Sequence, residues 1–174
     1  MKIHGDKVII KETDRGDLED IQQLWNNGEV MASVGYPDGL GQTFAEMGVW
    51  FKNIQECQQA KHYVIFTADE KFCGELFYRK NLKYNRAGLD IKLLPEAQGQ
   101  GLATEALQLI IDYIFKNEDK IEAVWTEPSV ENRAARKLYA RAGLEARERP
   151  ADLKPGRPYW ELSREDWQAL EVHS

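Results

Sequence analysis

One junction in the second half of the chain constrains the fold more than any other, because a β-rich run leads through a glycine turn into a helix. Residues 87–94 form the run, Pro95 stops it, and Gly99 and Gly101 lie in the turn. Glycine lets the backbone turn tightly and puts no Cβ between the main chain and a ligand. The first N–H groups of the next helix have no intrahelical partner and lie at the positive end of its dipole. The junction is therefore an expected anion site, suited to a pyrophosphate.

Two common nucleotide motifs fit this turn poorly. A P-loop requires Lys followed by Ser or Thr after its last glycine, whereas Leu102 and Ala103 follow here. The dinucleotide fingerprint requires a third small residue at another spacing, directly after the first strand of the fold. Considered alone, the turn is equally consistent with a plain structural turn.

Hydrophobic periodicity predicts the order strand, two helices, three strands, then helix, strand, helix and strand. The expected strands are 7–13, 62–68, 72–79, 87–94, 121–126 and 158–162. The expected helices are 17–27, a second one opened by Thr43 and Glu46 as a capping box, 100–117, 131–142 and a short one capped by Ser163. Gly28 is expected to end the first helix, and residues 30–41, which contain several glycines, are expected to form a loop. Grouped strands followed by alternation predict an α/β (α+β) class, with a mixed sheet and helices on both faces.

Length and charge limit the function classes. The 174 residues predict a single domain over 1–174, and the net charge of −6 argues against a nucleic-acid partner. No apolar run is long enough for a membrane span and no signal peptide is visible, so the cytoplasm is the expected location and no membrane partner is expected. Cys57 and Cys73 are expected to be reduced thiols. The three histidines show no metal-ligand spacing, so no metal is expected.

Two motifs in order resemble the GNAT acetyltransferase superfamily. Residues 98–103 read Gln-Gly-Gln-Gly-Leu-Ala, which matches the family's acetyl-coenzyme A motif Gln/Arg-x-x-Gly-x-Gly/Ala. Residues 132–144 resemble the family's Asn-x-x-Ala…Tyr…Gly-Phe helix, with Leu144 where Phe is commoner. The resemblance implies a GNAT fold with a mixed central β-sheet of about six to seven strands. The N-terminal third resembles the branch of ribosomal-protein alanine and spermidine acetyltransferases.

This resemblance implies an N-acetyltransferase that moves an acetyl group from acetyl-coenzyme A to a primary amine within a ternary complex. Backbone amides at the end of the strand are expected to bind the pantetheine arm, and the turn to bind the diphosphate. The residues expected to bind the cofactor are Ile91, Lys92, Leu93, Gln98, Gly99, Gln100, Gly101, Leu102, Ala103, Thr104 and Asn132. The alternatives are an ordinary core strand and, for Asn132, a polar residue at a helix start.

The resemblance makes Tyr139 the general acid, because a phenol with a pKa of about 10 can reprotonate a leaving thiolate. Its apolar stripe would equally suit a core tyrosine. The acceptor ammonium must lose a proton, and Asp90 is the first candidate for the base because it alternates with the core positions of its strand. Relatives often carry this carboxylate nearer the position of Gly88. Glu127 and a water chain are the alternatives to Asp90 as the base. The alternative role of Asp90 is a simple ion pair with Lys92.

Aromatic residues in loops offer candidate contacts with the acceptor, namely Tyr36 and Tyr84. Arg133, Arg136 and Lys137 are interpreted either as contacts with the nucleotide phosphates or as a solvated helix face. The acceptor is expected to be a protein N-terminus, a polyamine or another small amine. The alternative function is an acyl-coenzyme A sensor or scaffold without catalysis. Family members are often dimers, so a homodimer is a further expectation.

Overall fold

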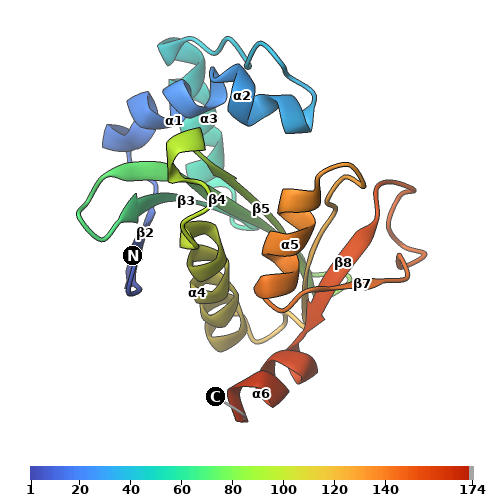
Figure 1. Cartoon of the computed structure of the whole chain (residues 1–174). Helices are drawn as coiled ribbons and strands as arrows, with labels where there is room; N and C mark the ends of the chain where they lie inside the picture. The colour runs from blue at the N-terminus through green and yellow to red at the C-terminus, as the bar shows by residue number, and fades with distance from the viewer. Residues whose placement is uncertain (173–174) are drawn as a thin grey trace. The chain divides into compact units, whose positions relative to one another are not determined.

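The computed structural model describes the backbone of residues 1–172 and the side chains of residues 1–170 (Figure 1). The strands are β1 Lys2–His4, β2 Val8–Glu12, β3 Ala60–Thr67, β4 Phe72–Asn81, β5 Arg86–Leu93, β6 Ala123–Thr126, β7 Glu145–Arg147 and β8 Tyr159–Ser163. The α-helices are α1 Leu18–Trp25, α2 Gly28–Met31, α3 Phe44–Glu56, α4 Leu102–Asn117, α5 Arg133–Arg141 and α6 Arg164–Val172. Three 3-10 helices also form, η1 Arg15–Asp17, η2 Ala32–Val34 and η3 Pro95–Ala97.

The strands form one mixed sheet in the hydrogen-bonded order β1-β2-β3-β4-β5-β6-β8-β7. Strands β5 and β6 pair in parallel, whereas β2 and β3, and β6 and β8, pair antiparallel. The α/β class with a mixed sheet is therefore confirmed. The sheet has eight strands, where the sequence predicted about six to seven. The pattern does not indicate β1 and β7, because three residues each are too few to show an alternation.

The chain divides into two compact units. The first comprises Met1–Tyr78 and Asp90–Ala106, and the second comprises Arg79–Leu89 and Leu107–Ser174. Strands β4 and β5 and helix α4 each contribute residues to both units.

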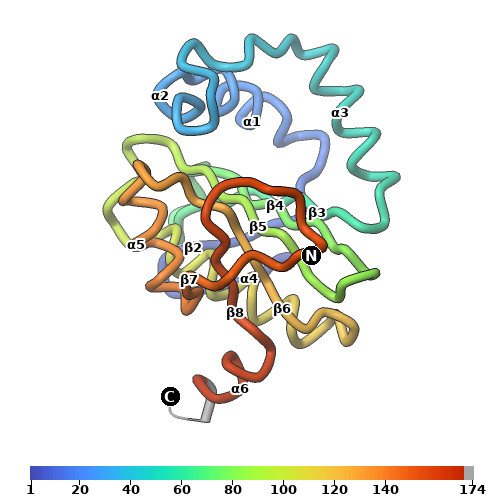
Figure 2. The backbone as a smooth tube through the Cα atoms, turned by 90° about the vertical axis from the view of Figure 1, so that its right-hand side faces the viewer, coloured from blue at the N-terminus to red at the C-terminus, as the bar shows by residue number. Residues whose placement is uncertain are grey.

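Helices α1, α2 and α3 lie together on the strands of the first unit, as both views show (Figures 1 and 2). Ile21, Met47 and Val64 are fully buried where α1, α3 and β3 meet. The rings of Trp25 and Trp50 pack edge to face beside them, with centroids 4.8 Å apart. This apolar contact covers one face of β3 and β4 with helices.

Helix α3 begins as its sequence predicts. The Thr43 side chain accepts from the Glu46 backbone N–H, and the Glu46 carboxylate accepts from the Thr43 backbone N–H at 2.8 Å. This reciprocal capping box satisfies two donors that the first turn of a helix leaves without partners.

The prediction of a loop over residues 30–41 is wrong for the first part of that range. Asn27 caps a short helix α2, because its Oδ1 accepts from the backbone N–H groups of Glu29 and Val30. Gly28 does not end α1 but begins α2, and a Cβ there would lie 2.2 Å from the Pro37 carbonyl oxygen. Met31 is buried, so packing against the core stabilises these four helical residues, although their sequence shows no helical period.

In the second unit, the Arg164 guanidinium fastens α6 to the end of α4. It donates to the carbonyls of Phe115, Glu118 and Ile121 at 2.6 to 3.0 Å. The α6 helix begins at the expected cap, where Ser163 Oγ accepts from the Asp166 backbone N–H at 3.1 Å. Carbonyls that end a helix without intrahelical partners are thereby satisfied.

Cys57 and Cys73 are both free, as expected. Burial raises the pKa of the Cys73 thiol to about 12, so this thiol is inert at neutral pH.

Candidate functional site

The glycine turn before α4 has the backbone that the sequence predicts. Gly99 and Gly101 adopt φ values of +75° and +79°, in the left-handed region that side chains rarely enter. A Cβ on Gly99 would meet nothing within 4 Å, so backbone conformation alone explains that glycine. Helix α4 begins directly afterwards, at Leu102.

Two glutamine side chains stiffen this turn from within. Gln98 Nε2 donates to the Leu93 carbonyl at 3.3 Å, and Gln100 Nε2 donates to the Glu96 carbonyl at 2.8 Å. Both side chains therefore bind carbonyls of their own segment.

The first bond within α4 runs from the Glu105 N–H to the Gly101 carbonyl at 3.2 Å. The N–H groups of Leu102, Ala103 and Thr104 precede it and have no acceptor within the helix. They form the positive end of a 16-residue helix, an arrangement suited to an anionic group such as a diphosphate.

Sequence reasoning missed a lysine at this helix start. The Lys7 ammonium donates to the Gln100 carbonyl at 3.5 Å, and a Cβ on Gly101 would lie 3.2 Å from the same nitrogen. The Glu105 carboxylate fixes the lysine's segment, because it accepts from the backbone N–H groups of Asp6, Lys7 and Val8 at 2.8 to 3.0 Å. A cation thus lies beside the turn, and no local pattern indicates it because 93 residues separate Lys7 from Gln100.

Strand β5 carries the residues expected to bind pantetheine. Leu93 is buried, Ile91 is partly buried, and Asp90 and Lys92 alternate with them. Asp90 and Lys92 form an ion pair, which is one of the arrangements that the sequence left open. The side chain of Asp90 remains 47% exposed, so its carboxylate is still accessible.

Lys92 also reaches a carboxylate that sequence analysis did not single out. Its ammonium lies 3.2 Å from Glu75 Oε1, while Trp25 Nε1 donates to Glu75 Oε2 at 2.7 Å and His62 Nε2 lies 2.9 Å from the same oxygen. Glu75 is only 3% exposed. Its three partners come from α1, β3 and β5, so only the folded chain brings this cluster together.

The charges in this cluster stabilise each other. Burial raises the pKa of Glu75, but the His62 hydrogen bond and the charges of His62 and Lys92 outweigh burial and lower it to about 2. Burial lowers the pKa of Lys92, but the charges of Glu75 and Asp90 raise it above its ordinary value. Glu75 is therefore a carboxylate and Lys92 an ammonium at neutral pH.

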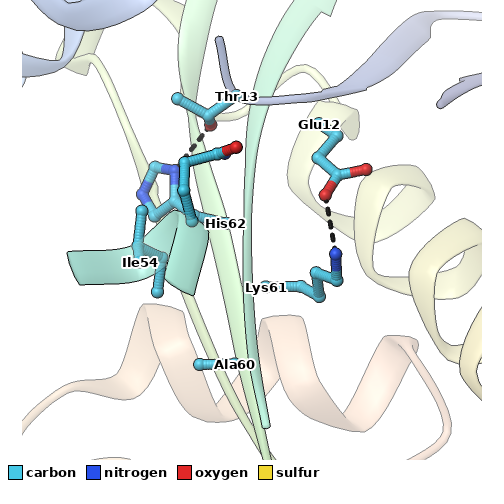
Figure 3. A pocket seen from close by; sticks show the side chains of 7 residues that line it. Glu12, Thr13, Ile54, Ala60, Lys61 and His62 are labelled. Carbon is cyan, nitrogen blue, oxygen red and sulfur yellow. Dashed lines mark hydrogen bonds and ion pairs between the residues drawn. The ribbon is translucent and has the colours of Figure 1, made fainter. Parts of the chain in front are cut away.

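A cavity of about 30 Å³ adjoins the same cluster at His62 (Figure 3). It is lined by Glu12, Thr13, Ile54, Gln55, Ala60, Lys61 and His62. Thr13 Oγ1 lies 2.7 Å from His62 Nδ1, and Lys61 donates to Glu12 at 2.8 Å. The volume suits about one or two water molecules, so this cavity is too small for an acceptor or a coenzyme.

In the second unit, Asn132 and Tyr139 lie on α5. Asn132 Oδ1 accepts from the Ala135 backbone N–H at 3.0 Å, so this side chain caps the helix. Tyr139 is 5% exposed. Within the described part of the chain, the buried Nε of Arg136 has no hydrogen-bond partner, which is unusual for a guanidinium and marks it as a candidate contact for an anionic group.

The remaining candidates lie in different surroundings. Glu127, the reserve base, accepts from Arg149 Nη2 at 2.6 Å in the second unit. Tyr36 belongs to the first unit and is 51% exposed, whereas Tyr84 belongs to the second, with the Lys83 ammonium 5.0 Å from its ring centroid.

Residues 1–172 contain neither a metal-binding cluster nor a membrane-spanning helix. No group of three or more His, Cys, Asp or Glu side chains there could hold a metal ion. No helix in that range has the length and apolar character that crossing a membrane requires.

The sequence matches a known family model and known enzymes. Residues 7–145 match the model described as an acetyltransferase (GNAT) domain. The spermidine N(1)-acetyltransferase of Escherichia coli K12 is 32% identical over 109 residues, which cover 62% of this chain. This chain spans 57% of the length of that relative.

Solved structures share the fold. The spermidine N-acetyltransferase of Vibrio cholerae, in complex with CoA and spermine, superposes with a TM-score of 0.80 at 21% identity, covering 94% of this chain and 99% of the other. An aminoglycoside acetyltransferase in complex with coenzyme A superposes with a TM-score of 0.77 at 17% identity, covering 94% and 99%. At these identities the likeness concerns the fold.

Proposed function

Because the chain belongs to the GNAT acetyltransferase family, we propose that it moves an acetyl group from acetyl-coenzyme A to a primary amine within a ternary complex. The observation that carries this proposal is the start of α4, where Gly99 and Gly101 turn the backbone so that the N–H groups of residues 102–104 begin a 16-residue helix. These groups suit a diphosphate, because unpaired amides and the helix dipole both favour negative charge.

The residues present fit the coenzyme. The turn offers amides and the nearby Lys7 ammonium, and in the second unit Arg136 offers a buried guanidinium nitrogen without a partner among the described residues. Both cations suit phosphate oxygens. Main-chain groups of Ile91, Lys92 and Leu93 are proposed to pair with the pantetheine arm, and Asn132 to contact it in addition to capping α5.

When bound, the coenzyme supplies a thioester whose carbonyl carbon the amine attacks. A main-chain N–H at the end of β5 stabilises the negative charge that develops on the carbonyl oxygen. Asp90 takes the proton that the ammonium must lose, directly or through water, and Tyr139 gives its phenolic proton to the leaving sulfur. The N–C bond forms and the C–S bond breaks. The second proton that the nitrogen loses restores the Tyr139 phenol, so the products are an amide and a free thiol.

A polyamine is the first acceptor to test, because the E. coli relative is a spermidine acetyltransferase. The net charge of −6 is compatible with a cationic acceptor. A protein N-terminus and other small amines are the remaining candidates. Tyr36 and Tyr84 are proposed as acceptor contacts, and we place the protein in the cytoplasm.

The test is turnover. The protein is incubated with acetyl-coenzyme A and, separately, with spermidine, spermine, an aminoglycoside and a peptide with a free N-terminus. Thiol release is followed, and the acetylated product is identified by mass. Turnover on any of these amines supports the proposal. Calorimetric binding of acetyl-coenzyme A without turnover on any amine would instead support a sensor or scaffold.

A further inference from the structure

The buried carboxylate of Glu75 is not used in the mechanism above, and its surroundings indicate what it does. Oε2 is held by Trp25 and His62 at 2.7 and 2.9 Å, which leaves Oε1 for the Lys92 ammonium at 3.2 Å. Burying a charge is costly unless it is paired and hydrogen-bonded, and Glu75 has both kinds of partner. Its position is therefore fixed from three directions.

Lys92 is shared between an inner and an outer carboxylate. Glu75 is the inner one, with a side chain 4% exposed, and Asp90 is the outer one, with a side chain 47% exposed. The Lys92 side chain itself is 14% exposed, so its charge interacts strongly with both carboxylates. The two carboxylates compete for one cation.

This competition matters for a base. An ammonium paired with a single carboxylate favours that carboxylate's ionised form and so weakens it as a proton acceptor. A second, buried carboxylate on the same ammonium reduces this effect.

We propose that Glu75 is a positioning residue for Asp90: it neutralises Lys92 from the buried side, so that Asp90 keeps enough basicity to accept the proton of the amine. This inference rests on the proposed function, in which Asp90 receives that proton.

The titratable and charged groups of the cluster all lie in the first unit, namely His62 on β3, Glu75 on β4, and Asp90 and Lys92 on β5. Helices α1 and α3 contribute the rings of Trp25 and Trp50, which do not titrate. Their centroids lie 6.4 and 4.8 Å from the centroid of the His62 ring. His62 is held on its other side by Thr13, where the small cavity adjoins it (Figure 3).

The proposal predicts opposite effects for two substitutions. Glu75→Gln keeps an oxygen acceptor but removes the negative charge, so Lys92 acts fully on Asp90 and weakens the base. Lys92→Met removes the cation, so Asp90 becomes a stronger base. The acidic limb of the pH profile of kcat/KM for the amine therefore moves to lower pH in Glu75→Gln and to higher pH in Lys92→Met, each by about one pH unit.

Rate constants give a second readout. In Glu75→Gln, kcat on the amine is expected to fall about tenfold, because a weaker base accepts a proton less effectively, while the KM for acetyl-coenzyme A stays within about twofold. Lys92→Arg keeps the cation and should restore the wild-type acidic limb, although its planar group packs differently.

Glu118→Gln is the matched control. Glu118 also pairs with a lysine, because both of its carboxylate oxygens accept from Lys80 at 2.9 Å, but this pair belongs to the second unit and has no proposed role. Its pH profile should match that of the wild type.

The outcomes separate the inference from the proposed function. The inference is supported by three results together. The wild type acetylates an amine, Asp90→Asn lowers the rate at least about a hundredfold, and the acidic limbs of Glu75→Gln and Lys92→Met move in opposite directions. If Asp90→Asn is inactive but both limbs stay at the wild-type pH or move together, Glu75 is only structural and the inference fails. If Asp90→Asn keeps the wild-type rate, both the role of Asp90 and the inference fail. Absence of turnover in the wild type overturns the proposed function itself.

Should Glu75→Gln not fold, the pair Lys92→Met and Lys92→Arg still decides. If the acidic limb of Lys92→Met stays at the wild-type pH, the proposal is contradicted.

Discussion

The ammonium of Lys7 lies 3.5 Å from the main-chain carbonyl of Gln100, although 93 residues separate them. The contact puts a cation from the turn between β1 and β2 beside the start of α4. Since the backbone of Lys7 is bound by Glu105 in the first turn of the same helix, the two segments hold each other in place. A positive charge fixed here adds to the field of the helix start.

Replacing Lys7 with Ala is expected to weaken the binding of acetyl-coenzyme A about threefold at low salt, because the phosphates lose a nearby cation, and less at high salt because exposed charges are screened. Calorimetry at two salt concentrations measures this. Lys2→Ala on β1, another exposed lysine, is the control and should bind normally. S-acetylpantetheine lacks the phosphates, so its KM should not change in Lys7→Ala; an equal loss with both donors would contradict a phosphate contact.

Gly101→Ala should destabilise the chain by about 1 kcal/mol or more, because alanine is strained at φ +79°, and should weaken coenzyme binding as the turn shifts. The matched substitution is Gly48→Ala in α3, where a Cβ meets nothing within 4 Å. That variant should be stabilised by about 0.5–1 kcal/mol, because alanine is the better helix former. Urea unfolding measures both, and similar effects in the two variants would refute a conformational need for glycine in the turn.

Tyr139→Phe should lower kcat about a hundredfold while the dissociation constant of acetyl-coenzyme A changes less than about twofold, because only the proton donor is removed. Steady-state rates and calorimetry measure the two quantities. Tyr113→Phe on α4 is the control for loss of a hydroxyl. An unchanged kcat in Tyr139→Phe would remove this phenol from the mechanism.

Stability at acidic pH should depend on Glu75. Its pKa is about 2 in the folded chain and 4.5 ordinarily. A lowered folded-state pKa means that ionised Glu75 stabilises the fold above about pH 4.5, and that this contribution is lost as the pH falls towards about 2. The free energy of unfolding should therefore fall more steeply over this range in the wild type than in Glu75→Gln. Urea unfolding at a series of pH values measures it, and parallel curves would show that Glu75 is not the group responsible.

Local patterns predict the parts of this molecule that local chemistry determines. The capping box of Thr43 and Glu46 and the glycine turn at Gly99 and Gly101 need only near neighbours, and both form as expected. The class and mixed sheet also follow from the order of the strands and helices. Helix α2 escapes prediction because four residues are too few to show a period.

The cluster around Glu75 escapes prediction for a different reason. Its partners Trp25, His62 and Lys92 lie 50, 13 and 17 residues away along the chain, on separate elements. A carboxylate within an apolar strand gives no sign of which side chains will surround it. The contact between Lys7 and Gln100 is likewise a property of the folded chain.

A crystal structure with coenzyme A bound tests the central claim most directly. The account predicts that diphosphate oxygens lie within about 3 Å of the main-chain N–H groups at the start of α4, residues 102–104, and that the coenzyme's sulfur lies beside the Tyr139 hydroxyl. A diphosphate bound elsewhere, with those amides facing only solvent or protein, would contradict it.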